Sequence, residues 1–305
     1  MAATVSVLIP TRNAGAGLER LLISLGRQTL TPLEVVVWDS ASDDATPEIA
    51  RQHGASVITI EADDFDHAST RSRMARAAGG DIVVFLTHDA IPADDCALEL
   101  LVAALRQQDD IACAYGRQIA AANASADARS LRDFNYPPHS EIRSLADRDH
   151  LGFTTFFCSN SFAAWRKSAL EQIGFFGESA IFAEDARAAA RLLQAGFRLA
   201  YAAEARVEHS HNYTLTEEFR RSFDIGVFHA REAWLLTVFG GPSDRGKHFV
   251  RKQVGELLRA GKIGTLAASV CHNGAKACGY LLGRRYRLIP SRLCRLLSMN
   301  RRWWR

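Results

Sequence analysis

The sequence lacks the cysteine patterns of a zinc knuckle or a disulfide framework. None of its cysteines forms a CxxC pair, and the six are scattered along the 305 residues: Cys96, Cys113, Cys158, Cys271, Cys278 and Cys294. Scattered cysteines without such a pattern are typical of proteins that fold in a reducing compartment. The cysteine content therefore favours a cytoplasmic protein.

Long apolar runs are also absent. The chain has no run of 18 uncharged apolar residues, which argues against a membrane-spanning helix. A strand-like stretch begins at Val5, so we expect no signal peptide ahead of it. The hydrophobic content of 48% is nevertheless ordinary for a globular protein, and the length suffices for one large α/β domain with an appendage or for two domains.

Two glycine motifs are missing from the first loop that is expected to join a strand to a helix. The loop Thr11–Gly15 contains neither GxGxxG nor GxxxxGK[ST]. Their absence argues against a dinucleotide-binding dehydrogenase and a P-loop NTPase. The sequence also contains no recognisable nucleic-acid-binding fold motif, so we expect no nucleic-acid partner.

Apolar strand-like runs alternate with stretches of helical periodicity through the first half of the chain. Strands are predicted at residues 5–10, 33–38, 55–60, 82–86 and 111–116, with helices between the first four. Two later segments, residues 154–166 and the stretch that ends at His211, also have strand character. Residues 120–149 are expected to form an irregular mobile loop. This alternation predicts an α/β fold with right-handed βαβ units and a mostly parallel sheet.

The most informative stretch is residues 81–92. Five apolar residues, Ile82–Leu86, predict a strand that is buried on both faces and that ends at the polar cluster Thr87-His88-Asp89. In open α/β sheets, ligands bind beyond the carboxyl ends of the strands. Asp89 is therefore placed to hold a metal ion and a phosphate, although it could instead cap a helix after Pro92.

Other polar side chains occupy equivalent positions. Asp39 ends the second predicted strand and could accept hydrogen bonds from a ribose or a base. His67 and Arg71 lie four residues apart at a predicted helix start, with Ser69 or Thr70 near the cap. They could form a diphosphate site, or they could simply be a solvated helix start.

Several segments together resemble one known family. The matching segments are Val5-Ser6-Val7-Leu8-Ile9-Pro10-Thr11-Arg12-Asn13, Gln28-Thr29, Val37-Trp38-Asp39-Ser40-Ala41-Ser42-Asp43 and Phe85-Leu86-Thr87-His88-Asp89-Ala90. They resemble the nucleotide-binding half of inverting family 2 glycosyltransferases with the GT-A fold, and the similarity spans most of residues 4–213. The combination of Phe65-x-His67-x-x-Thr70-Arg71 with Leu86-Thr87-x-Asp89-Ala90 is similar to the bacterial rhamnosyltransferase branch.

The resemblance implies roles for individual residues. In the family's Asp-x-Asp metal motif, Thr87 replaces the first carboxylate and Asp89 matches the second. Asp185 matches the catalytic base. The nucleotide-sugar residues implied are Pro10, Thr11, Arg12, Asn13, Asp39, Ser40, His67, Arg71, Thr87 and His88. The residues implied on the acceptor side are Asn160, Trp165 and Glu184.

Two of these assignments have simpler alternatives. Glu184 and Asp185 begin a predicted helix, where acidic residues are favoured by the helix dipole alone. His209 and His211 would share one face of a strand and could bind a divalent metal or phosphate, but a histidine pair is often structural or at the surface. The family often has a metal-contacting histidine here, and the sequence does not choose between the two.

The charge is unevenly distributed. Residues 245–305 contain 15 Lys+Arg and one acidic residue, whereas residues 1–244 contain 22 Lys+Arg and 33 Asp+Glu. The tail, residues 284–305, mixes eight arginines with leucines and Trp303-Trp304, and Pro290 should divide it into two short segments. We expect it to anchor the protein reversibly to an anionic membrane, apart from the catalytic chemistry. Its leucines could instead pack on the catalytic domain.

Together these features predict a GT-A catalytic domain at residues 1–215 and a helical C-terminal region at residues 216–305. The resemblance implies metal-dependent, inverting transfer of a sugar with Mg²⁺ or Mn²⁺. The donor would be dTDP-L-rhamnose and the acceptor a saccharide, lipid-linked, at the inner face of the cell membrane. The alternatives are another donor, UDP-glucose or UDP-N-acetylglucosamine, and a non-catalytic sugar-nucleotide-binding or membrane-scaffold protein. The three carboxylates Asp39, Asp89 and Asp185 argue against the latter.

Overall fold

One mixed β-sheet organises the computed structural model, which describes residues 3–241, 243–259 and 263–304. Its strand order is β3-β2-β1-β4-β8-β6-β9-β5, and β7 pairs with β9. The strands are β1 (Val5–Thr11), β2 (Glu34–Asp39), β3 (Ser56–Thr59), β4 (Ile82–Leu86), β5 (Ile91–Pro92), β6 (Ile111–Ile119), β7 (Glu141–Arg143), β8 (Phe162–Arg166) and β9 (Arg198–Glu208).

The first four long strands form the parallel half of this sheet. β1 pairs in parallel with β2 and with β4, and β2 pairs in parallel with β3. β8 then runs antiparallel to both β4 and β6, and β6 pairs in parallel with β9. The carboxyl ends of β1, β2, β4, β6 and β9 therefore face the same edge. The predicted α/β class and mostly parallel sheet are confirmed.

Helices cover both faces of the sheet. The α-helices are α1 (Gly15–Leu25), α2 (Thr46–Gln52), α3 (His67–Ala77), α4 (Ala97–Arg106), α5 (Ala126–Asn135), α6 (Arg148–Leu151), α7 (Lys167–Gln172), α8 (Glu184–Gln194), α9 (Leu215–Arg231), α10 (Ala233–Phe239), α11 (Ser243–Arg259), α12 (Ile263–Arg284) and α13 (Ser291–Leu297). The apolar sides of α1 and α4 share one core cluster with one face of the strands, and those of α3, α7 and α8 share another with the opposite face. Because both faces are covered, β4 is entirely buried, as its apolar run predicts.

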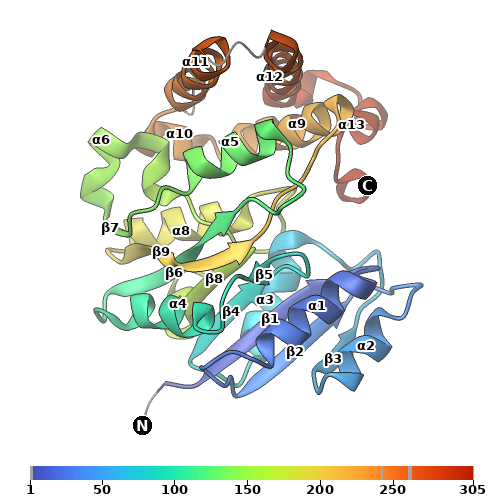
Figure 1. The fold of residues 1–305 in the computed structure, drawn as a ribbon, viewed down its shortest axis with the longest axis vertical. Helices are drawn as coiled ribbons and strands as arrows, with labels where there is room; N and C mark the ends of the chain where they lie inside the picture. The colour runs from blue at the N-terminus through green and yellow to red at the C-terminus, as the bar shows by residue number, and fades with distance from the viewer. Residues whose placement is uncertain (1–2, 242, 260–262, 305) are drawn as a thin grey trace.

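The C-terminal helices stack above the sheet (Figure 1). α9 packs closely along α12 because glycines let the two backbones approach. A Cβ added at Gly283 would lie 2.0 Å from the Phe223 carbonyl oxygen, and one at Gly226 would lie 2.3 Å from that of Tyr280. Phe223 and Val227 of α9 belong to the same core cluster as strands β4 and β8, so the C-terminal region continues the core of the catalytic part.

Two segments differ from the expected loop and strand. Residues 120–149, expected to be an irregular loop, contain α5 and β7. Ser125 caps α5 by accepting a hydrogen bond from the Ala128 amide. Of residues 154–166, only β8 is a strand. The preceding stretch is a 3₁₀ helix, η2 (Gly152–Phe156), whose first residue, Gly152, has a positive φ of 54°. The Thr155 hydroxyl donates a hydrogen bond to the Gly152 carbonyl oxygen.

The tail, residues 284–305, is divided at Pro290 as predicted, and part of it packs on the rest of the protein. Pro290 separates a 3₁₀ helix, η3 (Tyr286–Leu288), from α13, and a last 3₁₀ helix, η4 (Arg301–Trp303), follows. Tyr286, Trp303 and Trp304 pack against the main core cluster, although Leu288 remains 82% exposed. Part of the tail therefore packs on the catalytic part of the protein. The expected contact of the tail with an anionic membrane stays a prediction. Arg305 lies outside the described residues, within which no helix is both long and apolar enough to span a membrane.

Candidate active site

Three side chains converge beyond the carboxyl edge of the sheet. Asp89 lies in the turn after β4, and His209 and His211 follow β9. Nε2 of His209 lies 3.4 Å from Oδ1 of Asp89, and Nε2 of His211 lies 3.6 Å from Oδ2. One ligand atom from each of the three lies within 4.8 Å of the others. The structure thus brings both candidate histidines to Asp89. The alternative role of Asp89 as a cap does not apply, because α4 begins at Ala97 with Cys96 before it.

The pKa values of these side chains favour the protonation states that bind a cation. Burial opposes charge on Asp89, but the hydrogen bond and charge of His209, together with Thr87 and His88, hold the pKa of its carboxyl well below the usual range. Burial, followed by the charge of His209, lowers the pKa of His211 to about 4. At neutral pH the cluster therefore offers an ionised carboxylate and a neutral imidazole as ligands.

Gln118 of β6 orients His209, and no motif in the sequence indicated this residue. Its amide nitrogen donates to the Ser159 hydroxyl at 2.9 Å, so its carbonyl oxygen accepts from Nδ1 of His209, also at 2.9 Å. Nε2 of His209 consequently faces the Asp89 carboxylate. With the proton on Nδ1, neutral His209 has a lone pair on Nε2, which would repel the Asp89 carboxylate oxygen. A proton or a metal ion therefore belongs between these two atoms. This arrangement fits a metal site whose outer contacts fix one ligand.

A second feature is the cavity that we call the strand-end pocket, which has a volume of about 460 Å³. Its lining residues are Pro10, Thr11, Arg12, Ser40, Ala62, Phe65, Asp66, His67, Ala180, Ile181, Met299, Asn300, Arg301, Arg302 and Trp303. It therefore lies at the carboxyl ends of β1 and β2 and includes five of the ten residues implied for nucleotide-sugar binding. α3 begins here, and its cap is Asp66, which accepts from the Ala68 and Ser69 amides, rather than the expected Ser69 or Thr70.

Asn13, Asp39 and His88, which are also implied in nucleotide binding, are not among the residues that line this pocket. Asp39 is buried and accepts from the Thr11 hydroxyl and from both the hydroxyl and the amide of Ser42. Asn13, which has a positive φ of 47°, joins the same loop by accepting from the Asp43 amide. Asp39 thus shapes the loop after β2. His88 packs against the start of α1, where a Cβ added at Gly17 would lie 3.3 Å from its ring.

Asp185 lies in the first turn of α8. Its carboxylate accepts two backbone hydrogen bonds, from the Asn160 amide at 2.9 Å and from the Ala186 amide at 2.7 Å. Burial, and then the negative charge of Glu184, raises the pKa of Asp185 to about 7. A carboxylate with a pKa near the working pH is suited to accept a proton during a reaction, because it is available as a base yet basic enough to take the proton.

A buried hydrogen-bonded chain supports Asp185. Arg71 contacts Glu184 at 3.2 Å and His67 at 3.3 Å, Glu184 accepts from the Asn160 amide group, and Asn160 accepts from the indole nitrogen of Trp165. Burial disfavours charge on Glu184, but Arg71 and His67 hold the pKa of that carboxyl below its usual value.

The same contacts place the residues expected on the acceptor side. Trp165 is fully buried and Asn160 and Glu184 nearly so, and their hydrogen bonds hold the start of α8. Their role toward an acceptor stays a prediction. Arg71, expected at a diphosphate, is 6% exposed and is held by Glu184. It therefore joins α3 to α8. Only long-range packing reveals this network, because its members come from four separate segments.

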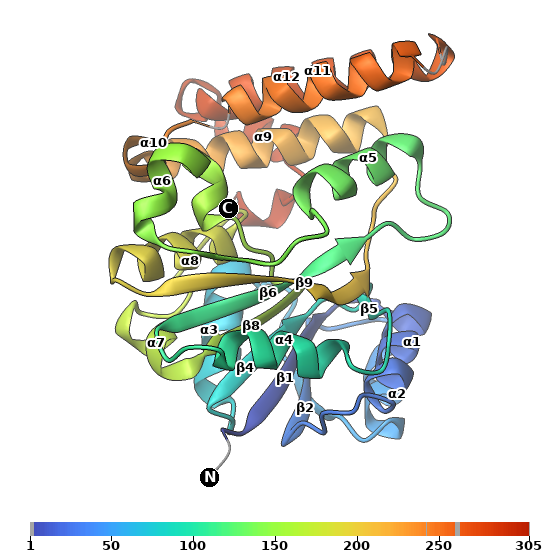
Figure 2. The ribbon, with the colours of Figure 1, turned by 60° about the vertical axis from the view of Figure 1, so that its left-hand side comes forward.

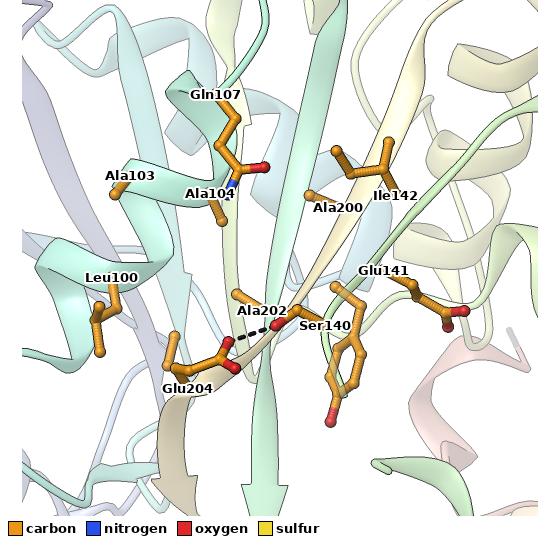
Figure 3. Close-up of a pocket in the computed structure, with 12 residues that line it drawn as sticks. Leu100, Ala103, Ala104, Gln107, Ser140, Glu141, Ile142, Ala200, Ala202 and Glu204 are labelled. Atoms are coloured by element: carbon orange, nitrogen blue, oxygen red, sulfur yellow. Dashed lines mark hydrogen bonds between the residues drawn. The ribbon is translucent and has the colours of Figure 1, made fainter. Parts of the chain in front are cut away.

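Another pocket of about 460 Å³ lies between α4, β7 and β9 (Figure 3). Alanines such as Ala200 and Ala202 line it, and at its edge Ser140 donates a hydrogen bond to Glu204. It contains none of the residues singled out in the sequence. Its polar lining side chains are Gln107, Ser140, Glu141, Tyr201 and Glu204, and the Ser140 hydroxyl is already bonded to Glu204. The chemistry is therefore placed at the strand-end pocket, the metal cluster and Asp185.

Three features together are those of a GT-A glycosyltransferase: a pocket at the ends of β1 and β2, a candidate cation site after β4 and a buried carboxylate with a raised pKa on α8. Residues 6–174 match the family model described as glycosyl transferase family 2, and the chain belongs to this family. The structure of a mannosyltransferase from Pyrobaculum calidifontis in complex with GDP-Man and Mn²⁺ has a TM-score of 0.60 at 18% identity, over 94% of this chain and 87% of that one.

Two curated relatives are similar over almost their whole length. The O-antigen chain rhamnosyltransferase RfbN of Salmonella typhimurium is 40% identical over 302 residues, which is 98% of this chain and 96% of the relative. The O-antigen chain rhamnosyltransferase WbaN of Salmonella anatum is also 40% identical, over 98% of this chain and 95% of the relative. The structure of Staphylococcus aureus TarS residues 1–349 with UDP-GlcNAc shares the fold, with a TM-score of 0.56 at 18% identity, over 97% of this chain and 84% of that one.

Proposed function

We propose that this glycosyltransferase transfers L-rhamnose from dTDP-L-rhamnose to a saccharide, with inversion at the anomeric carbon. The acceptor is a lipid-linked saccharide in the synthesis of a cell-surface polysaccharide. The observation that carries the proposal is the 40% identity, over nearly the whole of both chains, to two proteins named as O-antigen chain rhamnosyltransferases. The tested alternative is a UDP-hexose donor.

Each part of the site has a role in this reaction. The nucleotide lies in the strand-end pocket, where Arg12 and Ser40 offer polar groups at the ends of two strands. Asp185 accepts the proton of the acceptor hydroxyl as that oxygen attacks the anomeric carbon and the bond to the diphosphate breaks. Glu184, Asn160 and Arg71 keep the Asp185 carboxylate in place and set its basicity.

Asp89, His209 and His211 would hold a divalent cation, which stabilises the negative charge of the departing diphosphate when it is bound. Their donor set of one carboxylate and two imidazoles suits a transition-metal ion better than Mg²⁺, which prefers oxygen ligands. We therefore favour Mn²⁺. Two solved structures that share the fold are complexes with Mn²⁺.

The donor assignment is tested by incubating the protein, Mn²⁺ and a short rhamnose-accepting saccharide on a lipid carrier with each of three donors. These are dTDP-L-rhamnose, UDP-glucose and UDP-N-acetylglucosamine. We expect product with dTDP-L-rhamnose and a rate at least about tenfold lower with the others, because a site built for one sugar leaves polar groups unpaired with another. If only a UDP-hexose were turned over, that nucleotide sugar would be the donor instead of dTDP-L-rhamnose. Donor binding without turnover of any donor would favour a non-catalytic protein.

We also propose that the protein works at the inner face of the membrane, where α13 meets anionic lipid. Leu293 and Leu296 lie three residues apart on this helix and are 50% and 58% exposed. Arg292 and Arg295 alternate with them and are exposed too. Exposed leucines among arginines suit a helix that lies on an anionic surface.

Replacing Arg292 and Arg295 together by Ala should weaken binding to vesicles containing anionic lipid. Each arginine near such a surface contributes about 1 kcal/mol, so the loss should be roughly thirtyfold in a sedimentation assay at moderate salt. The matched control is the Arg27→Ala/Arg51→Ala double variant, which removes two exposed arginines far along the chain from α13. Equal binding of both double variants would remove α13 from the membrane contact.

A further inference from the structure

The end of the chain forms one wall of the strand-end pocket. Met299, Asn300, Arg301, Arg302 and Trp303, which we call the tail wall, line this cavity opposite residues of β1 and the loop after β2. Every other residue that lines the pocket is more than a hundred positions away in the sequence. Figure 2 shows the C-terminus returning toward the sheet from beneath α9 and α12. The wall is thus built by the fold of the whole chain.

Specific contacts hold the tail wall in place. Asp224 of α9 is buried, and its Oδ2 accepts hydrogen bonds from the amides of Met299 and Asn300, both at 3.0 Å. The side-chain amide of Asn300 donates to the Ile181 carbonyl oxygen at 2.8 Å. The Trp303 indole donates to the Ser179 hydroxyl at 3.0 Å. These bonds fix the wall on α9 and on the segment that precedes α8.

Three of the five residues of the wall, Asn300, Arg301 and Arg302, bring polar or cationic side chains to the cavity. Oδ1 of Asn300 lies 3.5 Å from Nε2 of His67, and a guanidinium nitrogen of Arg302 donates to the Ala62 carbonyl oxygen at 3.4 Å. Arg301 and Arg302 are both exposed. They join Arg12 of the opposite wall, so three arginines border one cavity.

The opposite wall contains polar atoms that lack a partner. Nη1 of Arg12 and Oγ of Ser40 are buried, and neither has a hydrogen-bond partner among the described residues. Buried polar groups in native proteins are satisfied by protein, water or ligand. Unpartnered donors beside arginines suit an anionic ligand with several acceptor oxygens. A nucleoside diphosphate has this chemistry.

We propose that the tail wall completes the donor site, with Arg301 and Arg302 binding the phosphates of the nucleoside diphosphate and Asn300 positioning His67. This proposal rests on the proposed nucleotide-sugar transfer and extends it to a segment that follows the family's matched residues by more than a hundred positions. The tail is then a substrate-binding element, and α13, just before it, meets the membrane.

The test measures binding of dTDP in the presence of Mn²⁺ by calorimetry, using the full chain. We expect the Arg301→Ala/Arg302→Ala double variant to bind dTDP at least about tenfold more weakly, because each lost charge-assisted hydrogen bond weakens binding by this order. Binding of thymidine, which has no phosphate, should change less than twofold. Both arginines are exposed, so the contacts of Asp224 and Trp303 that hold the wall remain.

The matched control is the Arg285→Ala/Arg287→Ala double variant, which removes two exposed arginines of the same tail outside the pocket. It should bind dTDP as the wild type does. Restoring the charge in Arg301→Lys/Arg302→Lys should recover part of the affinity. Unchanged dTDP binding in the alanine variant, or an equal loss for dTDP and thymidine, would overturn the inference. A wild-type protein that binds no nucleoside diphosphate would instead overturn the proposed function.

Discussion

Replacing Asp185 by Asn should lower kcat by about a hundredfold or more while nucleotide affinity stays near the wild-type value. The amide has almost the shape of the carboxylate but cannot accept the proton of the acceptor hydroxyl, and general-base catalysis typically contributes this much. Single-turnover rates and the Kd for dTDP with Mn²⁺ separate the two effects. A variant with kcat close to wild type would require another residue as the base.

The wild-type pH profile provides an independent check on this assignment. Asp185 must be ionised to act as a base, and burial beside Glu184 raises its pKa to about 7. kcat should therefore increase tenfold per pH unit below about pH 7 and level off above it. Asp185→Asn should abolish this pH dependence in its residual activity. A wild-type profile that is flat between pH 5 and 8 would contradict the raised pKa.

The hydrogen bonds of Asp185 predict how Asp185→Asn changes the stability of the protein. The carboxylate accepts one bond from the Asn160 amide and one from the Ala186 amide, and the single oxygen of Asn can replace only one of them. Losing the other costs about 1 kcal/mol. Burial raises the pKa of Asp185 from 3.8 to about 7, so the wild type loses stability as the pH rises between these two values, where the unfolded carboxyl is ionised and the folded one is still protonated. The variant has no such group, so its stability relative to the wild type should improve over this range and stay constant above about pH 7.

Replacing Asp89 by Ala should weaken the Mn²⁺-dependent binding of the nucleotide. Asp89 supplies the carboxylate of the cluster, and both histidines face it. Without this charge, the two imidazoles hold a cation much more weakly, and we expect an increase of at least about a hundredfold in the Mn²⁺ concentration needed for half-maximal dTDP binding. The measurement is a calorimetric titration with dTDP at several Mn²⁺ concentrations.

The control for Asp89→Ala is Asp95→Ala, which removes an exposed carboxylate a few residues further along the chain. It should leave the Mn²⁺ dependence unchanged. Replacing Gln118 by Ala should have a smaller effect of the same kind, about tenfold, because His209 keeps its ring but loses the bond that orients it. An identical Mn²⁺ dependence in Asp89→Ala and the wild type would remove Asp89 from the metal site.

The sequence by itself determined the parts of the protein that local patterns encode. The apolar run Ile82–Leu86 is β4 with the predicted bounds, and Pro290 divides the tail where expected. Strand ends and helix starts are also local, so the sequence placed Asp89 at the edge where ligands bind in such sheets and Asp185 at the start of a helix. The role of Asp185 as a base came from the family resemblance. The spacing of His209 and His211 indicated that the two would share a face.

Only the tertiary structure decided how these pieces meet. Residues 284–305 have the composition of a membrane-binding tail, but their packing on Asp224 and Ser179 places part of them in the strand-end pocket. The chain from Arg71 to Trp165 and the orientation of His209 by Gln118 likewise join residues about 90 positions apart. Periodicity and capping depend on near neighbours along the chain. Such distant contacts instead depend on burial and on which polar groups find partners when the sheet and helices pack.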